Sequence, residues 1–122
     1  MFKTVIPVLH VSNSAAAEEF YCKRLGFRRE FAYRPDATKP DPCYMGVTRD
    51  GVLVHLSSFS GDGVSGSVVY LVVDDVDALH TEFVLKGVPI DTGPVDWTWG
   101  NREMYVKDAD RNSIRFSQDR LA

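Results

Sequence analysis

The pattern of hydrophobic and polar positions predicts a strand, a helix and three more strands in the first half of the chain. Residues 4–11 (TVIPVLHV) are rich in β-branched side chains, as strands are. Ser12, Asn13 and Ser14 follow, and each can cap the first turn of a helix. Gly26 then favours the end of that helix. Between these signals, apolar residues recur at helical spacing at Ala17, Phe20, Tyr21 and Leu25. Three strand-like runs come next, at residues 27–34, 43–51 and 52–59.

The second half of the chain repeats this order. Residues 67–75 predict a strand, and Asp74 or Asp75 can cap the helix after it. One face of that helix carries Val76, Leu79, His80 and Phe83. The repeat is completed by an extended segment at 89–99, a strand at 102–107, a turn at 108–112 and a strand at 113–118.

The repeat divides the chain into two βαβββ modules within one domain, residues 1–122. The first module covers about 1–60 and the second about 67–122, joined by a flexible linker at 61–66. A βαβββ unit leaves one face of its sheet bare, so two units must combine to bury it. We therefore expect an α+β fold with a strongly curved mixed sheet, helices on the convex side and a concave cavity inside.

Composition narrows the class of partner. The net charge of −3 and the pI near 5.5 argue against nucleic acid or an anionic membrane, which both favour a basic face. A cationic small molecule matches that charge better. No apolar run approaches the roughly 18 residues of a membrane span. Cys22 and Cys43 lack the spacing of a zinc site, and we expect reduced thiols and a cytoplasmic protein.

Two motifs resemble the glyoxalase, bleomycin-resistance and extradiol-dioxygenase superfamily, whose architecture is the vicinal-oxygen-chelate fold. The first is IPVLHVSNSAAAEEFYCKRLGF at residues 6–27, and the second is WGNREMYVKDADRNSIRF at 99–116. The likeness runs nearly end to end. Ala109 and Arg111 depart from it, because the family has Pro and Gly in this last turn. Since Arg accepts a left-handed backbone less readily than Gly, we expect an alternative turn geometry there.

The resemblance also implies where a divalent metal would be held in the enzymes of this family. The corresponding positions carry Ile6, His55, Val68 and Arg115. Two of these side chains are hydrocarbon, and an arginine stays cationic and repels a metal. We therefore expect no metal and no other cofactor. The pattern resembles the bleomycin-resistance branch, which binds a drug without transforming it.

Trp97 and Trp99 are the leading candidates for ligand contact. They stand two apart in a segment that we interpret as extended, so their rings should point the same way. The Gly, Pro and Asp residues around them favour an exposed loop over a core position. Aromatic faces in such a place stack on planar heterocycles and attract cations. A buried core pair and a dimer interface remain alternatives.

Five further residues complete the predicted ligand site. His55 and Phe59 share a strand face, and Tyr44 follows a proline-rich loop that could form a rim or a plain surface loop. Arg115 needs an anion or carbonyl, which either Glu103 or the ligand could supply. Tyr105 belongs to the closing motif. A hydrogen-bonded structural role for His55 stays open.

Two other patterns have plainer interpretations. Arg102 and Glu103 are neighbours on a strand and face opposite ways, so a cross-strand ion pair is expected for each. Asp108, Asp110 and Asn112 resemble the opening of a calcium loop, but that loop needs Gly and Glu where this chain has Ser113 and Asp119. A tight turn is the better interpretation.

Together these observations predict a metal-independent protein that sequesters an aromatic, cationic natural product, such as a glycopeptide antibiotic of the bleomycin type. A homodimer is expected, since the resemblance implies two subunits around one cleft. The alternative is an enzyme, either a metal-dependent lyase or dioxygenase, or an isomerase that uses His55. A domain that binds no small ligand is a third alternative.

Overall fold

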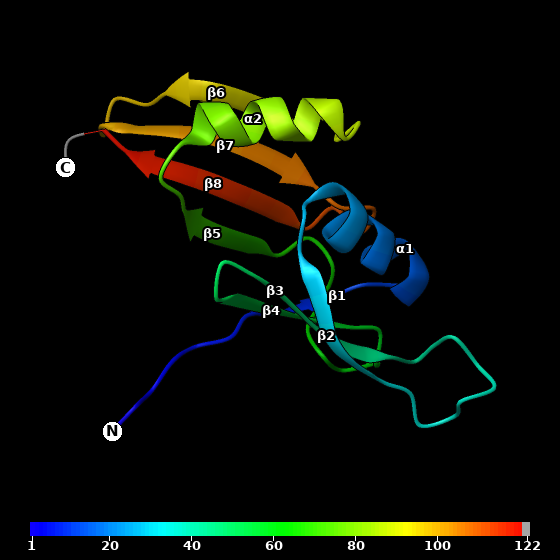
Figure 1. Cartoon of the computed structure of the whole chain (residues 1–122). Helices are drawn as coiled ribbons and strands as arrows, with labels where there is room; N and C mark the ends of the chain where they lie inside the picture. The colour runs from blue at the N-terminus through cyan, green and yellow to red at the C-terminus, as the bar shows by residue number, and fades with distance from the viewer. Residues whose placement is uncertain (121–122) are drawn as a thin grey trace. The chain divides into compact units, whose positions relative to one another are not determined.

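The structure is a computed structural model that describes residues 1–120. It divides into two compact units, one of residues Met1–Ser65 and one from Gly66 onward. Each unit holds one four-stranded sheet, so the strands form two sheets rather than one. The α+β class and the two βαβββ units are confirmed (Figure 1). None of the helices in the described residues is long and apolar enough to cross a membrane.

The first unit has the strand order β1-β4-β3-β2, with β1 parallel to β4 and the other neighbours antiparallel. Its elements are β1 (Val8–His10), α1 (Ser14–Glu18), the π-helix η1 (Glu19–Arg24), β2 (Arg28–Tyr33), β3 (Tyr44–Arg49) and β4 (Val52–Ser57). The strand expected at residues 4–11 is shorter in the structure. Pro7 accepts a hydrogen bond from the His55 amide but has no N–H to donate, so the ladder stops there.

The helix of this unit changes its hydrogen bonding part-way. Asn13 caps α1 by accepting from the amide of Ala16, as expected. From Glu19 onward the turns widen, and the amide of Leu25 donates to the carbonyl of Phe20. In an α-helix, residues four apart drift around the axis because a turn takes about 3.6 residues. The wider turn offsets that drift and keeps one face buried, formed by Ala17, Tyr21 and Leu25.

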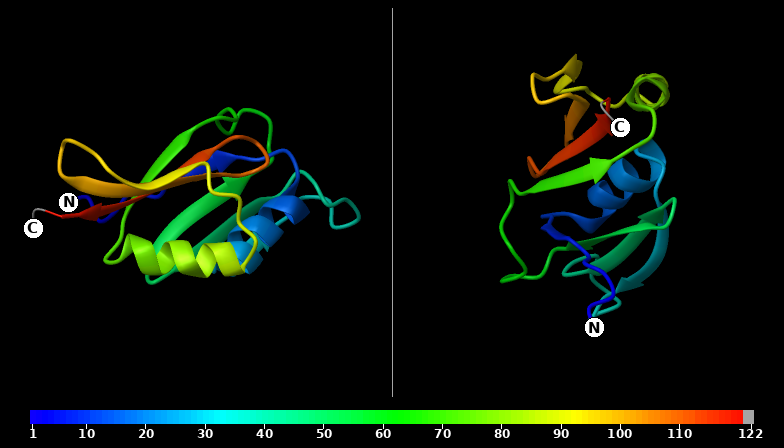
Figure 2. Two further views of the ribbon diagram at one scale, coloured as in Figure 1. Left: turned by 90° about the horizontal axis from the view of Figure 1, so that it is seen from above. Right: turned by 90° about the vertical axis from the view of Figure 1, so that its left-hand side faces the viewer.

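The second unit has the strand order β5-β8-β7-β6, with β5 parallel to β8 and the other neighbours antiparallel (Figure 1). Its elements are β5 (Val68–Val72), α2 (Val76–Leu85), β6 (Thr92–Asp96), β7 (Asn101–Lys107) and β8 (Ser113–Asp119). Asp75 caps α2 by accepting from the amide of Ala78. Figure 2 shows α2 along one face of this sheet. Phe83 of α2 packs edge-on against Phe116 of β8, with 5.2 Å between ring centroids.

The turn between β7 and β8 keeps the left-handed residue that we expected it to lose. Arg111 has φ +64°, so the expected alternative geometry is wrong. The reason is Asp108, whose Oδ1 accepts from the amides of Asp110 and Asn112, both at 2.9 Å. Its Oδ2 accepts from the side-chain amide of Asn112 at 2.9 Å. This carboxylate holds the turn closed and makes up for the unfavourable backbone at Arg111.

Arg111→Gly is expected to stabilise the protein by roughly 0.5–1 kcal/mol, because glycine adopts this φ without the Cβ clash but adds some entropy to the unfolded chain. Urea denaturation measures the change. Asp50, with φ +52°, provides a second left-handed site for the same substitution. A loss of stability in Arg111→Gly would contradict this account.

Each sheet has one face opposite its helix, which we call its helix-free face. On the first sheet this face carries Tyr44 and His55, since Val54 and Leu56 on the alternate side are buried in the core. On the second sheet it carries Tyr70, Glu103, Tyr105, Arg115 and Ser117. Several apolar side chains on these faces are exposed, which is unusual unless something binds there. They are Val8, Phe31, Tyr33, Val68, Tyr70 and Val72.

Candidate ligand-binding site

Trp97 and Trp99 lie in the turn that joins β6 to β7, not in an extended segment as expected. The amide of Trp97 donates to Asn101 at 2.9 Å, and the amide of Gly100 donates to Trp97 at 3.1 Å. The two indole rings are nevertheless stacked, with centroids 5.1 Å apart and planes 9° from parallel. Trp99 is 59% exposed and Trp97 is half-buried. The turn therefore presents an accessible, flat aromatic surface, and neither ring belongs to the hydrophobic core.

Tyr105 and Arg115 extend this surface along the second sheet. The Tyr105 ring stacks on Trp97, with centroids 6.4 Å apart. The guanidinium carbon of Arg115 lies 4.5 Å from the centroid of the Tyr105 ring, a cation–π distance. The strand register explains the contact, because Tyr105 lies directly opposite Arg115. Four of the expected ligand contacts thus come together: Trp97, Trp99, Tyr105 and Arg115.

Glu103 is buried on the same face and accepts hydrogen bonds from two tyrosines. It is 1% exposed, with the Tyr70 hydroxyl at 2.6 Å and the Tyr105 hydroxyl at 2.7 Å. Burial alone raises the pKa of this carboxyl, but hydrogen bonds from Tyr70, Tyr105, Ser117 and Trp99 outweigh it and lower the pKa. Burial and the bond to Glu103 raise the pKa of Tyr105. At neutral pH the carboxylate is therefore ionised and the phenol is protonated.

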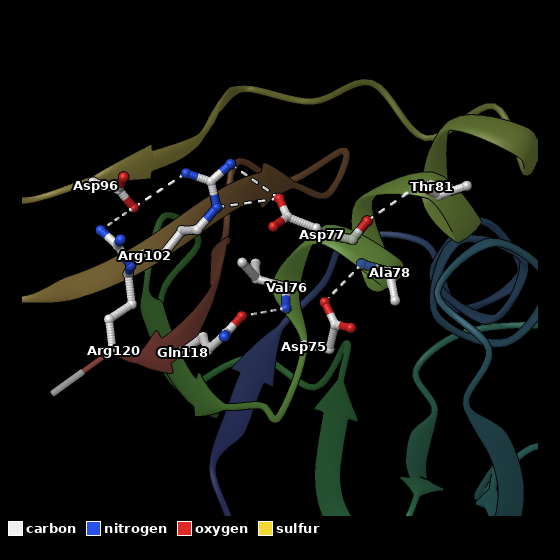
Figure 3. A network of polar contacts seen from close by, with 9 residues as sticks. All are labelled: Asp75, Val76, Asp77, Ala78, Thr81, Asp96, Arg102, Gln118 and Arg120. Carbon is white, nitrogen blue, oxygen red and sulfur yellow. Dashed lines mark hydrogen bonds and ion pairs between the residues drawn. The ribbon is translucent and has the colours of Figure 1, made fainter. Parts of the chain in front are cut away.

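Arg102 points to the opposite side of the sheet from Glu103, as expected, and forms the ion pair predicted for it (Figure 3). Its guanidinium donates to Asp77 at 3.0 Å and to Asp96 at 3.1 Å. These hydrogen bonds raise the pKa of Arg102, and the bond to Asp77 contributes most. The ion pair expected for Glu103 is wrong, because its carboxylate accepts from tyrosine hydroxyls instead. Pairing of Glu103 with Arg115 is not found either, since Arg115 lies over Tyr105.

The helix-free face of the first sheet holds the other three expected contacts. The Tyr44 hydroxyl and His55 Nδ1 are 2.8 Å apart, a hydrogen bond. Burial, and then the charge of Asp62, raise the pKa of Tyr44. Phe31 stacks on Tyr44 with centroids 6.3 Å apart, and its ring lies directly on the Cα of Gly46. Phe59 lies just beyond β4 and stacks on Tyr33 at 6.4 Å.

Comparison with known proteins shows the family. The model of the family described as "Glyoxalase superfamily protein" matches residues 1–121. The chain belongs to the glyoxalase superfamily. No protein with a curated description matches it in sequence.

Solved structures of the superfamily share the fold of this chain over nearly its whole length. TnmS3, an antibiotic binding protein from Streptomyces sp. CB03234, is 24% identical with a TM-score of 0.77, covering 98% of this chain and 97% of that one. A glyoxalase/bleomycin resistance protein from the same strain is 26% identical with a TM-score of 0.72, covering 93% and 97%. Lactoylglutathione lyase from Agrobacterium tumefaciens is 18% identical with a TM-score of 0.75, covering 98% and 95%. An antibiotic binding protein and a lyase thus share this fold, and the side chains must decide between binding and catalysis.

The side chains at the four metal positions of the superfamily do not fit a metal ion in this chain. Ile6 and Val68 offer no lone pair. Arg115 carries a positive charge over Tyr105, and Nδ1 of His55 is engaged by the Tyr44 hydroxyl. Within residues 1–120, no three His, Cys, Asp or Glu side chains gather closely enough to hold an ion. This glyoxalase-superfamily chain thus lacks the ligand set that the resemblance assigns to its enzymes.

Three residues that contact the expected site residues, each within its own unit, were not predicted from the sequence. Tyr70 and Phe31 appeared only as strand residues, and Glu103 was assigned to an ion pair. The contacts of all three depend on which residues lie opposite one another in the sheet, as Phe31 lies opposite Gly46. A bulky aromatic opposite a glycine was the available signal for Phe31, since the ring can fill the missing side chain's space. Alternation alone does not reveal such pairs.

Proposed function

We propose that this protein binds a planar aromatic small molecule, of the kind found among natural-product antibiotics, without a metal and without transforming it. The stacked pair Trp97 and Trp99 carries the proposal, because an exposed pair of parallel indoles favours a flat ligand over bulk solvent. Tyr105 of β7 extends the stack, because its ring packs on Trp97. The similarity to TnmS3, an antibiotic binding protein, supports the same class of function.

The three residues predicted on the first unit stay proposed ligand contacts of that unit by itself. Tyr44, His55 and Phe59 present aromatic or polar groups from one side of that sheet, backed by Phe31 and Tyr33. Their edges and hydroxyls suit a ligand that combines flat rings with polar groups. A homodimer and a cytoplasmic location stay predictions.

The positive charge expected for the ligand has less support than its planarity. The expectation rested on the net charge of the whole chain, −3. On the helix-free face of the second sheet, the carboxylate among the residues named above is that of Glu103. It is buried and already accepts hydrogen bonds from two tyrosine hydroxyls. The aromatic surface is therefore the part of the site on which this proposal depends.

Calorimetric titration with bleomycin and with anthracene-2-carboxamide tests the proposal. The carboxamide is expected to bind, and Trp99→Ala is expected to weaken its binding about tenfold, since a lost aromatic stack accounts for about 1 kcal/mol beyond the lost contact area. Phe2→Ala is the matched control, because it removes an aromatic ring that is 103% exposed and lies outside both sheets. If neither compound produces heat or quenches tryptophan fluorescence, the proposal fails.

Proton transfer by His55 is the second candidate function. The hydrogen bond between Tyr44 and His55 favours it, because it orients the imidazole on a helix-free face. A catalyst changes its ligand, whereas a binding protein returns it intact. Mass spectrometry of the ligand recovered after long incubation separates the two, and an unchanged ligand removes this candidate.

A further inference from the structure

The guanidinium of Arg115 has no acceptor among the described residues. Its Nε is buried without a hydrogen-bond partner, and the contact that it does make is with the face of the Tyr105 ring. An arginine has five N–H donors, and buried donors are nearly always paired. A half-buried cation left with a ring alone is short of negative charge and of oxygen acceptors.

The nearest carboxylate in the register does not fill this gap. Glu103 lies opposite Ser117, one alternate position away from Arg115, which lies opposite Tyr105. Its two oxygens accept from Tyr70 and Tyr105. Tyr105 thus uses its hydroxyl for Glu103 and its ring for Arg115, and it separates the anion from the cation.

Arg102 shows what a fully paired arginine looks like in the same sheet. Its Nε and Nη2 donate to Asp77, and its Nη1 donates to Asp96, which also accepts from Arg120 (Figure 3). That guanidinium therefore has carboxylates on two sides. The two arginines differ in the face that they occupy: Arg102 lies on the helix side, and Arg115 lies on the face that bears the aromatic stack.

A second donor without an acceptor lies in the same stack. Nε1 of Trp97 is buried and has no hydrogen-bond partner in the structure. Trp97 and Arg115 both pack on Tyr105, so two unsatisfied N–H groups adjoin one ring. Arg115 lies at the Tyr105 end of this stack, and Trp99 lies at its exposed end. Donors gathered beside a stacking surface indicate an acceptor that arrives with the ligand.

We propose that the ligand is a planar aromatic compound bearing an anionic oxygen, a carboxylate or an ionised phenol, which pairs with Arg115 while its rings lie against the stack of Tyr105, Trp97 and Trp99. This inference rests on the proposed function and adds the polar group of the ligand. It replaces a cationic ligand with an anionic one at this site. The guanidinium fork matches a carboxylate, and the partial burial of Arg115 makes such a pair stronger than one in open solvent.

Three probes with one ring system test the charge. Anthracene-2-carboxylate is anionic, anthracene-2-carboxamide is neutral, and anthracene-2-methylammonium is cationic at pH 7. Quenching of tryptophan fluorescence reports binding at this site directly, because the chain has two tryptophans and both are in the stack. The carboxylate is expected to bind at least about tenfold more tightly than the carboxamide, with the cation weakest, and salt should weaken the carboxylate alone.

Substitution of Arg115 tests the partner. In Arg115→Met the advantage of the carboxylate over the carboxamide should vanish, while the carboxamide still binds. Arg115→Lys should keep part of the advantage, since it keeps the charge but not the fork. Lys86→Met is the matched control: it removes one positive charge from an exposed residue at the end of α2 and should leave the ratio unchanged. Circular dichroism confirms that the variants are folded.

The outcomes separate this inference from the proposed function. Equal binding of carboxylate and carboxamide by the wild type, or a ratio that survives Arg115→Met, overturns the anionic ligand and leaves aromatic binding standing. Tighter binding of the cationic probe overturns it too and restores a cationic ligand. If no probe quenches the tryptophans, the proposed function fails and this inference fails with it.

Discussion

Gly93→Ala is expected to lower the free energy of unfolding by about 3 kcal/mol or more. Gly93 has φ +83°, a backbone conformation that costs a residue with a Cβ roughly 1–2 kcal/mol. A Cβ placed there would also collide with the carbonyl oxygen of Glu103 and would lie 3.0 Å from the amide nitrogen of Val95. Both obstacles are backbone atoms of the sheet, which cannot move aside as a flexible side chain can. Urea denaturation measures the loss.

Gly87→Ala is the matched control for this prediction. Gly87 has φ +73°, close to that of Gly93, but an added Cβ would meet nothing within 4 Å. Gly87→Ala should therefore lower the free energy of unfolding only by the cost of a left-handed backbone, about 1–2 kcal/mol. The difference between the two variants isolates the close approach of β6 to β7 at the bulge between Thr92 and Val95. Equal losses in the two variants would show that the bulge accommodates a side chain.

The order of elements could be predicted from the sequence because its signals are local. The cap at Asp75, the glycine after the first helix and the alternation in the strands each depend on a few neighbouring residues. The same holds for the turn at 108–112, which the Asp and Asn residues indicated correctly. Its left-handed Arg111 was missed, since no pattern showed that Asp108 would accept from three groups at once.

The site was only partly predictable, because its contacts depend on register. Trp97, Trp99, Tyr105 and Arg115 were identified, and the structure gathers them. Whether Arg115 meets Glu103 or Tyr105 is decided by a shift of two residues between β7 and β8. Alternation predicts which face a side chain occupies but not its opposite number on the next strand. The positive charge of the ligand was inferred from the net charge of the whole chain. Net charge is a poor guide to a binding site, because it includes surfaces that a small ligand does not contact.

Glu103→Ala is expected to destabilise the protein by about 2–4 kcal/mol, because it leaves the hydroxyls of Tyr70 and Tyr105 without their acceptor. The loss should extend to binding. Tyr105 carries both the Trp97 stack and Arg115, and without Glu103 nothing holds its hydroxyl in place. Denaturation and fluorescence titration measure the two effects.

The pH dependence of Glu103→Gln shows whether the ionised carboxylate is responsible. The pKa of Glu103 is lowered from the ordinary 4.5, so its charge contributes stability that is present above that pH and is lost as the pH falls through the lower folded value. Protonated Glu103 closely resembles glutamine. The stability gap between wild type and Glu103→Gln should therefore be widest near neutrality and close in acid. Glu19→Gln, at an exposed helix position, changes the same charge and should stay within about 0.5 kcal/mol of wild type throughout. A stability gap that stays constant from neutral pH into acid would mean that the amide group, not the lost charge, destabilises Glu103→Gln. The stabilising role of the ionised Glu103 carboxylate would then be wrong.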